Sequence, residues 1–207
     1  MRCDDQADQC QVLRAGGVDA RLVVLDVSED WHVSGTLVCV GTGMLLGGHL
    51  TPRARHEIEQ ADSVLALVYD GLFELWLRQL NPRFESLQPL YLEGQSRRLT
   101  YDRMVERLVA SARSGQRTCG AFYGHPGVFA CVPHEAVRAA RAKGIEAYLE
   151  PGISAEDCLY ADLGLDPGDA GCQHFEATQF LLYRRRIDPS VQLGPGGIEE
   201  DNHCYFS

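Results

Sequence analysis

Apolar, strand-like runs alternate with helix-like segments over most of the chain, and this alternation constrains the fold most strongly. The run at 63–69 is nearly continuous in apolar residues, which is typical of a strand that helices cover on both faces. Such alternation predicts an α/β fold with a mostly parallel sheet and helices on both faces. The strand-like runs lie at 36–40, 63–69, 118–123 and 146–150, with shorter ones at 86–90 and 173–176.

Capping residues and glycines mark the predicted helix ends. Thr51 followed by Pro52 predicts a helix to about Ala61, because threonine caps a helix start and proline suits its first position. Ser154 with Asp157 three residues later predicts another start, in a capping-box-like arrangement. Three more helices are expected: one with the face Leu72, Phe73, Trp76 and Leu80, one capped by Thr100 with the stripe Met104, Val105, Leu108, Val109 and Ala112, and one from Pro133 to Gly144.

The composition bounds the class of protein. The chain has 207 residues, of which 45% are hydrophobic and 23% charged, so one large or two small domains can bury a core. The net charge of −10 repels nucleic-acid phosphates and anionic lipids, so neither is expected as a partner. No apolar stretch approaches the roughly 18 residues of a membrane span. The acidic segment 1–11 lacks the apolar core of a secretory signal, so we expect a cytoplasmic protein.

Eight cysteines are present, at positions 3, 10, 39, 119, 131, 158, 172 and 204. No two of them are spaced as C-x-x-C, and no histidine pair completes a zinc pattern. Cys39 and Cys119 fall inside strand-like runs. We therefore expect buried, reduced thiols, with no disulfide and no structural metal.

The patterns divide the chain into four parts. Residues 1–35 read as an N-terminal extension, and 36–145 as the first α/β domain. Residues 146–183 read as the beginning of a second α/β domain. The acidic, Gly/Pro-rich segment 184–207 contains no convincing helix or strand, and we expect it to be largely disordered.

Glycine-rich turns follow three of the predicted strands. They are Gly41-Thr42-Gly43, the segment 124–127 and the segment 151–154. In parallel sheets ligands bind beyond the carboxyl ends of the strands, so the three turns are expected to converge into one pocket. The first turn lacks the third glycine of a dinucleotide fingerprint, and Asp70 is the only candidate to grip a ribose. It can be a nicotinamide site, a tight structural turn, or a turn facing another adenosyl cofactor, which is the favoured alternative.

Three separated motifs carry a family resemblance. They are VGTGMLLGGHLTPRARHEIEQAD, FYGHPGVFAC, and EPGISAEDCLYADLGLDP with the following CQHFEATQFL. Together they resemble the N-methyltransferase domain of borosin enzymes, within the tetrapyrrole-methylase superfamily, from about Leu37 to Tyr183. The wider superfamily usually has an acidic residue in the loop where this chain has His125, and the histidine version is similar to the peptide-methylating branch.

The resemblance implies S-adenosylmethionine as the cofactor, bound between two α/β domains. Glycine clearance, an apolar cover and a polar helix start are compatible with that ligand. The matching cofactor-contacting positions are Tyr123, His125, Val128 and Phe129 in the second motif, and Ser154 and Ala155 in the third, beside the glycines Gly41 and Gly43.

The peptide-methylating branch carries a Tyr–Arg–Tyr set before its third long helix, and Tyr91, Arg97 and Tyr101 match it in the polar loop 91–99 and just after it. A further tyrosine of some relatives falls at Gln88, which departs from the pattern. An amide nitrogen becomes nucleophilic only when its proton is removed, so a tyrosine base and an arginine that polarises the amide oxygen suit this chemistry. The alternative is that Tyr101 only packs in the core and the arginines are solvated.

The resemblance also sets expectations for partners. The relatives continue through a complete second domain, so this chain is expected to be an incomplete reading frame, to be completed by another chain, or to be an inactive paralogue. It implies a separate peptide precursor as substrate and a homodimer in the complete form. The competing readings are a methylase of tetrapyrroles or other small molecules, a non-catalytic fragment or binding subunit, and a nicotinamide oxidoreductase.

Overall fold

The computed structural model describes residues 35–184, 186–187 and 192–195. The predicted extension 1–35 therefore lies, apart from Gly35, outside the described residues, as does most of the predicted tail. The described chain confirms the α/β prediction, because five strands form one sheet in which every neighbouring pair is parallel. The strand order is β3-β2-β4-β1-β5, with β1 (Thr36–Gly41), β2 (Ser63–Leu67), β3 (Phe84–Ser86), β4 (Arg117–Phe122) and β5 (Glu146–Leu149).

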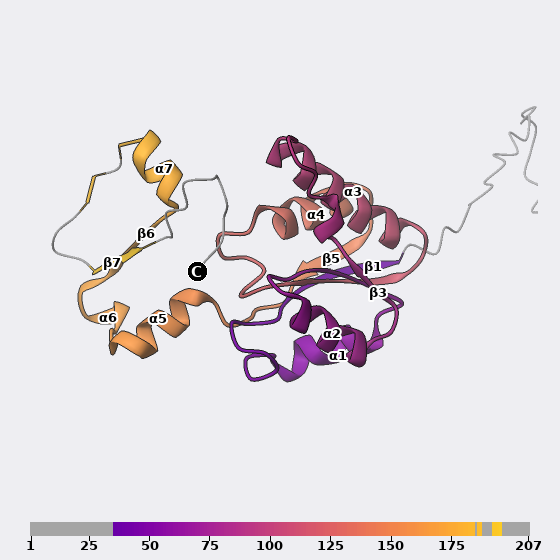
Figure 1. Ribbon diagram of the computed structural model, residues 1–207, viewed down its shortest axis with the longest axis horizontal. Helices are drawn as coiled ribbons and strands as arrows, with labels where there is room; N and C mark the ends of the chain where they lie inside the picture. The colour runs from indigo at the N-terminus through magenta and orange to yellow at the C-terminus, as the bar shows by residue number, and fades with distance from the viewer. Residues whose placement is uncertain (1–34, 185, 188–191, 196–207) are drawn as a thin grey trace, which may run out of the picture. The chain divides into compact units, whose positions relative to one another are not determined.

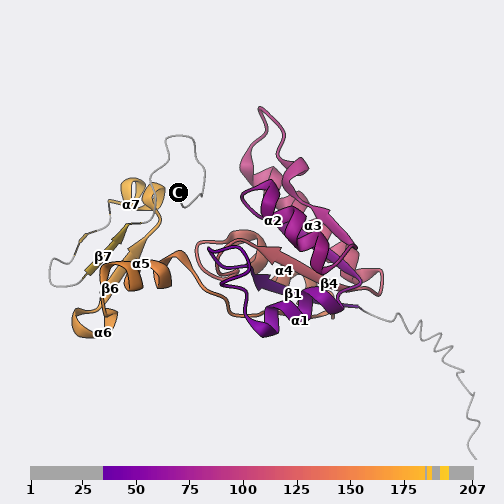
Figure 2. The same cartoon turned by 60° about the horizontal axis from the view of Figure 1, so that its bottom comes forward.

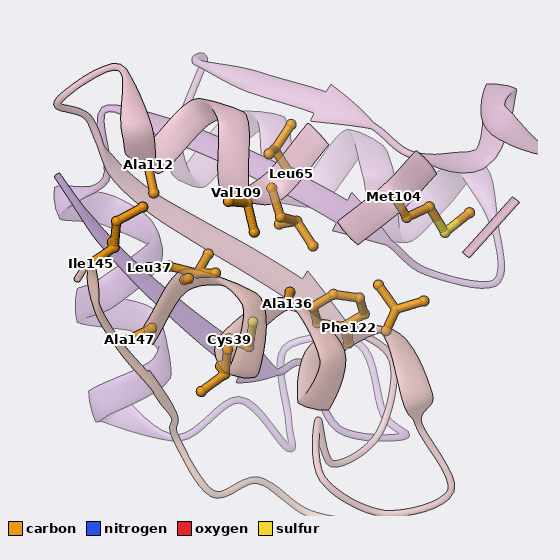
Figure 3. Close-up of a cluster of buried hydrophobic side chains, with 14 of the residues drawn as sticks. Leu37, Cys39, Leu65, Met104, Val109, Ala112, Phe122, Ala136, Ile145 and Ala147 are labelled. Carbon is orange, nitrogen blue, oxygen red and sulfur yellow. The ribbon is translucent and has the colours of Figure 1, made fainter. Parts of the chain in front are cut away.

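Helices cover both faces of this sheet, as Figure 1 shows. One face packs against α1 (Pro52–Gln60) and α2 (Gly71–Leu80), and the other against α3 (Arg97–Arg113) and α4 (Cys131–Arg141). Because side chains alternate along a strand, Leu37 and Cys39 of β1 join the core under α3 and α4, whereas Val38 and Val40 join the core over α1 and α2. Figure 2 shows β1 beside β4 at the centre of the sheet, and Figure 3 shows the side chains packed under α3 and α4.

Local capping explains the helix starts that the sequence predicted. The Thr51 side chain accepts a hydrogen bond from the Ala54 N–H at 3.1 Å, and Pro52 takes the first position of α1. Ser154 and Asp157 form the complete capping box of α5 (Ala155–Leu163). These two predictions are confirmed.

The starts of α3 and α4 differ from the prediction. Ser96, not Thr100, caps α3, because its side chain accepts from the Leu99 N–H at 3.4 Å. Thr100 is instead buried in the first turn. As a result, Arg97 lies in the helix rather than in the polar loop before it. Helix α4 begins at Cys131, two residues before the predicted Pro133.

Two further expectations need correction. In α2 Phe73 and Leu77 are buried and Trp76 and Leu80 pack against the same core, as predicted for all but Leu77. Leu72 is 66% exposed, so Leu77 and not Leu72 belongs to the apolar face. The strand predicted at 86–90 is β3 followed by a 3₁₀ turn, η1 (Gln88–Leu90), because Gln88-Pro89 opens a turn that a strand cannot continue.

Beyond β5 the chain forms short elements: α5, α6 (Pro167–Ala170), β6 (Cys172–Phe175), α7 (Ala177–Leu182) and β7 (Gln192–Pro195). Strand β6 confirms the strand expected at 173–176. Strand β7 pairs with it in parallel, so the segment 184–207 does contain a strand, contrary to the sequence prediction. A Gly-Pro pair disfavours strand assignment from sequence, but an edge strand tolerates both residues.

Candidate functional site

The three glycine turns after β1, β4 and β5 meet. The backbones of Gly43 and Gly124 exchange two N–H···O hydrogen bonds of 3.1 Å. A Cβ atom on Gly41 would overlap the carbonyl oxygen of Gly124 and would lie 2.9 Å from Pro126 Cδ. A Cβ atom on Gly152 would lie 3.2 Å from Gly41 Cα. The turns therefore converge as the sequence suggested. Gly41 is required for close packing against the Gly124 backbone, so no space for a ligand is left beside its Cα atom.

A cavity of about 460 Å³ opens next to this junction, at the carboxyl ends of β2 and β4. This is the edge of the sheet where a parallel α/β fold binds ligands, and the volume is that of a small-molecule site. Its walls are mainly apolar and aromatic. The lining consists of Leu67, Val68, Tyr69, Gln88, Tyr91, Tyr101, Phe122, Tyr123, Gly127, Val128, Phe129, Ala130, Cys131, Val132, Pro133, His134 and Glu176.

Two tyrosine pairs stand in the cavity wall. The rings of Tyr91 and Tyr101 meet edge to face, with centroids 6.4 Å apart. Those of Tyr69 and Tyr123 are 4.6 Å apart. Burial, and then the neighbouring Tyr69, raise the pKa of the Tyr123 phenol. Tyr123 is therefore a neutral hydrogen-bonding group at physiological pH.

The loop between β4 and α4 carries backbone strain at the cavity. Phe129 has φ of +48°, in the left-handed region that a bulky side chain rarely adopts. Such strain persists only where the surroundings impose it, and it is concentrated at ligand sites. The loop is held by a hydrogen bond from the Val128 N–H to the His125 carbonyl oxygen at 3.3 Å. Both Val128 and Phe129 line the cavity, as the predicted cofactor loop requires.

His125 itself is not in the cavity lining. Its Nδ1 accepts a hydrogen bond from the Gly127 N–H at 2.9 Å, which shapes the turn. The Gly127 carbonyl oxygen lies 3.0 Å from His134 Nε2 on α4. In the structure His125 therefore stabilises the loop, and the residues that follow it in the loop form the cavity wall.

Arg97 has an unsatisfied donor. Within the described part of the chain, its Nη2 atom is buried and has no hydrogen-bond partner. A buried unpaired guanidinium nitrogen is costly, and it points to a missing acceptor. Arg97 and Arg98 also occupy the first two positions of α3, where the helix dipole disfavours positive charge. Arg97 is not in the cavity lining, whereas Tyr101, one helical turn later on the same side of α3, is.

Ser154 and Ala155 lie at the glycine junction but outside the cavity lining. The Ser154 hydroxyl donates to Asp157 Oδ2 at 2.6 Å and accepts from the Asp157 N–H at 3.2 Å. Burial alone would raise the pKa of Asp157, but the hydrogen bonds from Ser154 outweigh it and lower that pKa. The hydroxyl is therefore engaged in the helix cap, and Ala155 is the first residue of α5.

Comparison with known proteins shows the family. Residues 36–192 match the model of the tetrapyrrole (corrin/porphyrin) methylases. The chain belongs to this family. The resemblance seen in the three motifs is thereby confirmed, together with the fold that it implied.

Relatives of this chain include borosin enzymes. It is 45% identical over 160 residues to a methyltransferase/ribosomally synthesized type I borosin cyclic peptide precursor of Coprinopsis marcescibilis, covering 77% of this chain and 41% of the relative. It is 41% identical over 178 residues to the methyltransferase/omphalotin A precursor of Omphalotus olearius, covering 84% and 43%. The chain thus spans about two fifths of the length of these relatives.

Solved structures agree on the fold of this chain. The uroporphyrin-III-C-methyltransferase of Thermus thermophilus aligns with a TM-score of 0.50 and 27% identity, over 64% of this chain and 54% of that one. A diphthine synthase aligns with a TM-score of 0.52 over 67% and 53%, and its 17% identity supports the fold alone.

Twelve residues of the cavity lining were not predicted as site residues, and among them are the polar side chains of Tyr69, Gln88, His134 and Glu176. Tyr69 follows β2, so the rule that ligands bind at the carboxyl ends of strands could have found it. Gln88, noted only as a departure from the family pattern, lies in the wall, where its Nε2 donates to the Val68 carbonyl oxygen at 2.6 Å. His134 and Glu176 reach the cavity through tertiary packing, and no local sequence pattern predicts their place in its wall.

The nicotinamide alternative depended on Asp70 to bind a ribose, but the Asp70 side chain has another role in the structure. The Asp70 side chain accepts from the N–H groups of Leu72 and Phe73, at 2.8 and 2.9 Å, and so caps α2. Among the described residues, no group of three or more His, Cys, Asp or Glu side chains is arranged to hold a metal ion. No helix in the same part of the chain is long and apolar enough to cross a bilayer.

Proposed function

We propose that this methylase transfers methyl groups from S-adenosylmethionine to backbone amide nitrogens of a peptide. The observation that carries the proposal is the composition of one cavity. Its wall brings Tyr91 and Tyr101, the candidates from the peptide-methylating pattern, together with Tyr123, Val128 and Phe129 from the predicted cofactor loop. Segments far apart in sequence that meet at one strand-end cavity make a single site for cofactor and substrate.

The cavity residues are suited to an adenosyl ligand. The volume of about 460 Å³ is of the right order, and Val128 and Phe129 offer apolar cover for adenine or methionine carbons. The start of α4 lines the cavity and its N-cap residue Ala130 makes no side-chain hydrogen bond, so the positive end of the helix dipole suits the ligand's carboxylate. S-adenosylmethionine, when bound, supplies an electrophilic methyl group on a positively charged sulfur. Gly41, Gly43, His125, Ser154 and Ala155 support the site by holding its turns.

The chain's own groups account for activation of the amide. Methylation requires loss of the N–H proton, which leaves negative charge on the amide oxygen. In this proposal Tyr101 or Tyr91, after losing its own proton to solvent, accepts the amide proton as a phenolate. Arg97 lies outside the cavity lining, and its buried Nη2 donates to the amide oxygen. Both tasks depend on exclusion of water, which the aromatic wall favours.

The proposal also covers the peptide partner, the oligomeric state and the compartment of the enzyme. The relatives are named as methyltransferase and peptide precursor in one chain. Here we propose that the precursor peptide is a separate chain, that the complete form is a homodimer, and that the enzyme is cytoplasmic. The buried free thiols of Cys39 and Cys119 support a reducing compartment.

Mass spectrometry of a co-expressed precursor peptide tests the proposal. Mass increases of one methylene unit, located on backbone nitrogens by fragmentation, are expected. A peptide that stays unmodified while the purified chain binds S-adenosylmethionine would redirect the assignment to another substrate. Absence of calorimetric heat and of a thermal shift at saturating cofactor would favour a non-catalytic fragment or binding subunit.

A tetrapyrrole or other small-molecule substrate is the second candidate. The family description and the alignment with uroporphyrin-III-C-methyltransferase favour it. The same cofactor assay with uroporphyrinogen in place of the peptide separates the two candidates, since only one of the two substrates should be methylated.

A further inference from the structure

The cavity wall has an unusual charge balance. It contains six aromatic rings, those of Tyr69, Tyr91, Tyr101, Phe122, Tyr123 and Phe129, and a single carboxylate, that of Glu176. No lysine or arginine is in the lining. Aromatic faces attract cations, and a carboxylate adds a full opposite charge in a partly desolvated setting. The wall is therefore suited to a ligand with a positive charge close to apolar groups.

Secondary structure before and after Glu176 fixes its backbone. Just before it, His174 on β6 is fixed to α5, with Nδ1 2.7 Å from Glu156 Oε1 and Nε2 2.6 Å from the Tyr160 hydroxyl. Just after it, α7 begins, and the Glu176 carbonyl oxygen accepts from the Phe180 N–H at 2.8 Å. The backbone that carries the carboxylate is thus fixed relative to α5 and α7 by two independent sets of hydrogen bonds, and Glu176 is part of the cavity lining.

The sulfonium of S-adenosylmethionine is a cation of this kind, with its positive charge surrounded by carbon. We propose that the Glu176 carboxylate, set among the cavity aromatics, is the counter-charge by which the methylase prefers the sulfonium cofactor to its neutral thioether product. This inference rests on the proposed methyl donor. After transfer the sulfur is uncharged, so the same carboxylate no longer attracts it, and product release is favoured over retention.

Binding calorimetry with three ligands tests this role without measuring activity. S-adenosylmethionine carries the sulfonium, S-adenosylhomocysteine carries a neutral sulfur, and sinefungin carries a protonated amine in place of the sulfonium methyl. Glu176→Gln should weaken S-adenosylmethionine and sinefungin about tenfold while changing S-adenosylhomocysteine less than about twofold. Glu176→Asp, which keeps the charge, should retain a preference for the charged ligands.

Glu106→Gln is the matched control, because it removes one negative charge from the exposed side of α3, outside the cavity. It should leave all three affinities unchanged. Equal weakening of the charged and neutral ligands by Glu176→Gln would overturn the inference, because the carboxylate would then bind a part that the ligands share. An unchanged affinity for all three would overturn it as well. A wild-type chain that binds none of the three contradicts the proposed function itself.

Discussion

Tyr91 and Tyr101 meet edge to face in the cavity wall, with ring planes at 85° and centroids 6.4 Å apart. Tyr91 follows η1, and Tyr101 lies in the second turn of α3, so the contact joins two elements at the mouth of one site. Arg97 lies one turn earlier on α3 and keeps a buried donor without a partner among the described residues. The pair and the arginine together form the part of the site that can be dissected by removing single polar groups.

Tyr101→Phe keeps the ring that packs on Tyr91 and removes only the hydroxyl. If the phenolate form of Tyr101 accepts the amide proton, the rate of N-methylation should fall by about 10²–10⁴ while cofactor affinity is unchanged. Single-turnover mass spectrometry of the peptide measures the rate. Tyr148→Phe removes a hydroxyl on β5, outside the cavity, and should leave the rate intact. Tyr101→Phe at wild-type rate would remove Tyr101 from the mechanism and leave Tyr91 as the remaining tyrosine.

Arg97→Gln removes the buried donor for which the described residues offer no partner. If Nη2 stabilises negative charge on the amide oxygen, methylation should slow by about 10²–10³. Folding stability should fall little, because no hydrogen bond of that atom is lost. Arg98→Gln is the control: Arg98 is 87% exposed and pairs with Asp102 on the helix surface, where an ion pair contributes little. Equal effects of the two substitutions on the rate would indicate a general charge effect instead.

Local signals explain which parts of this structure the sequence could predict. Thr51-Pro52 caps α1 through contacts only three residues apart, so the signal and the structure coincide. The left-handed φ of Phe129 and the buried Nη2 of Arg97 depend on packing between distant segments, and neither has a local signature. Gly41 shows the limit of sequence-based prediction. A glycine at this position indicates that another group approaches the backbone closely, but only the fold shows that this group is Gly124 rather than a cofactor.

Gly41→Ala tests that packing. Its Cβ would overlap the Gly124 carbonyl oxygen, which backbone hydrogen bonds hold in place, so the turn cannot yield at low cost. A destabilisation of about 1–3 kcal/mol is expected in urea unfolding. Gly71→Ala is the matched control, since nothing lies within 4 Å of its added Cβ and it stands in the first turn of α2, where alanine is favourable. An unchanged midpoint for Gly41→Ala would place the glycine requirement at a ligand instead.

Glu57 gives stability a defined pH dependence. Its side chain is 2% exposed and lies 2.6 Å from Arg117 Nη2 and 3.0 Å from Arg53 Nη2. Burial alone would raise the pKa of Glu57, but the pairing with Arg117 and then Arg53 lowers it below its ordinary value of 4.5. A carboxyl group with a lowered pKa in the folded state stabilises the fold above its unfolded pKa, and this contribution is lost as the pH falls through the folded value.

Glu57→Gln should therefore cost about 1–3 kcal/mol of unfolding free energy near pH 7, where the arginines lose a charged acceptor. The difference between wild type and variant should shrink as the pH falls below about 4.5, because the wild-type carboxyl is then protonated as well. Urea unfolding at a series of pH values from neutral to acidic measures both curves. A gap that stays constant across this range would mean that the shape of Glu57, and not its charge, stabilises the contact between α1 and the sheet.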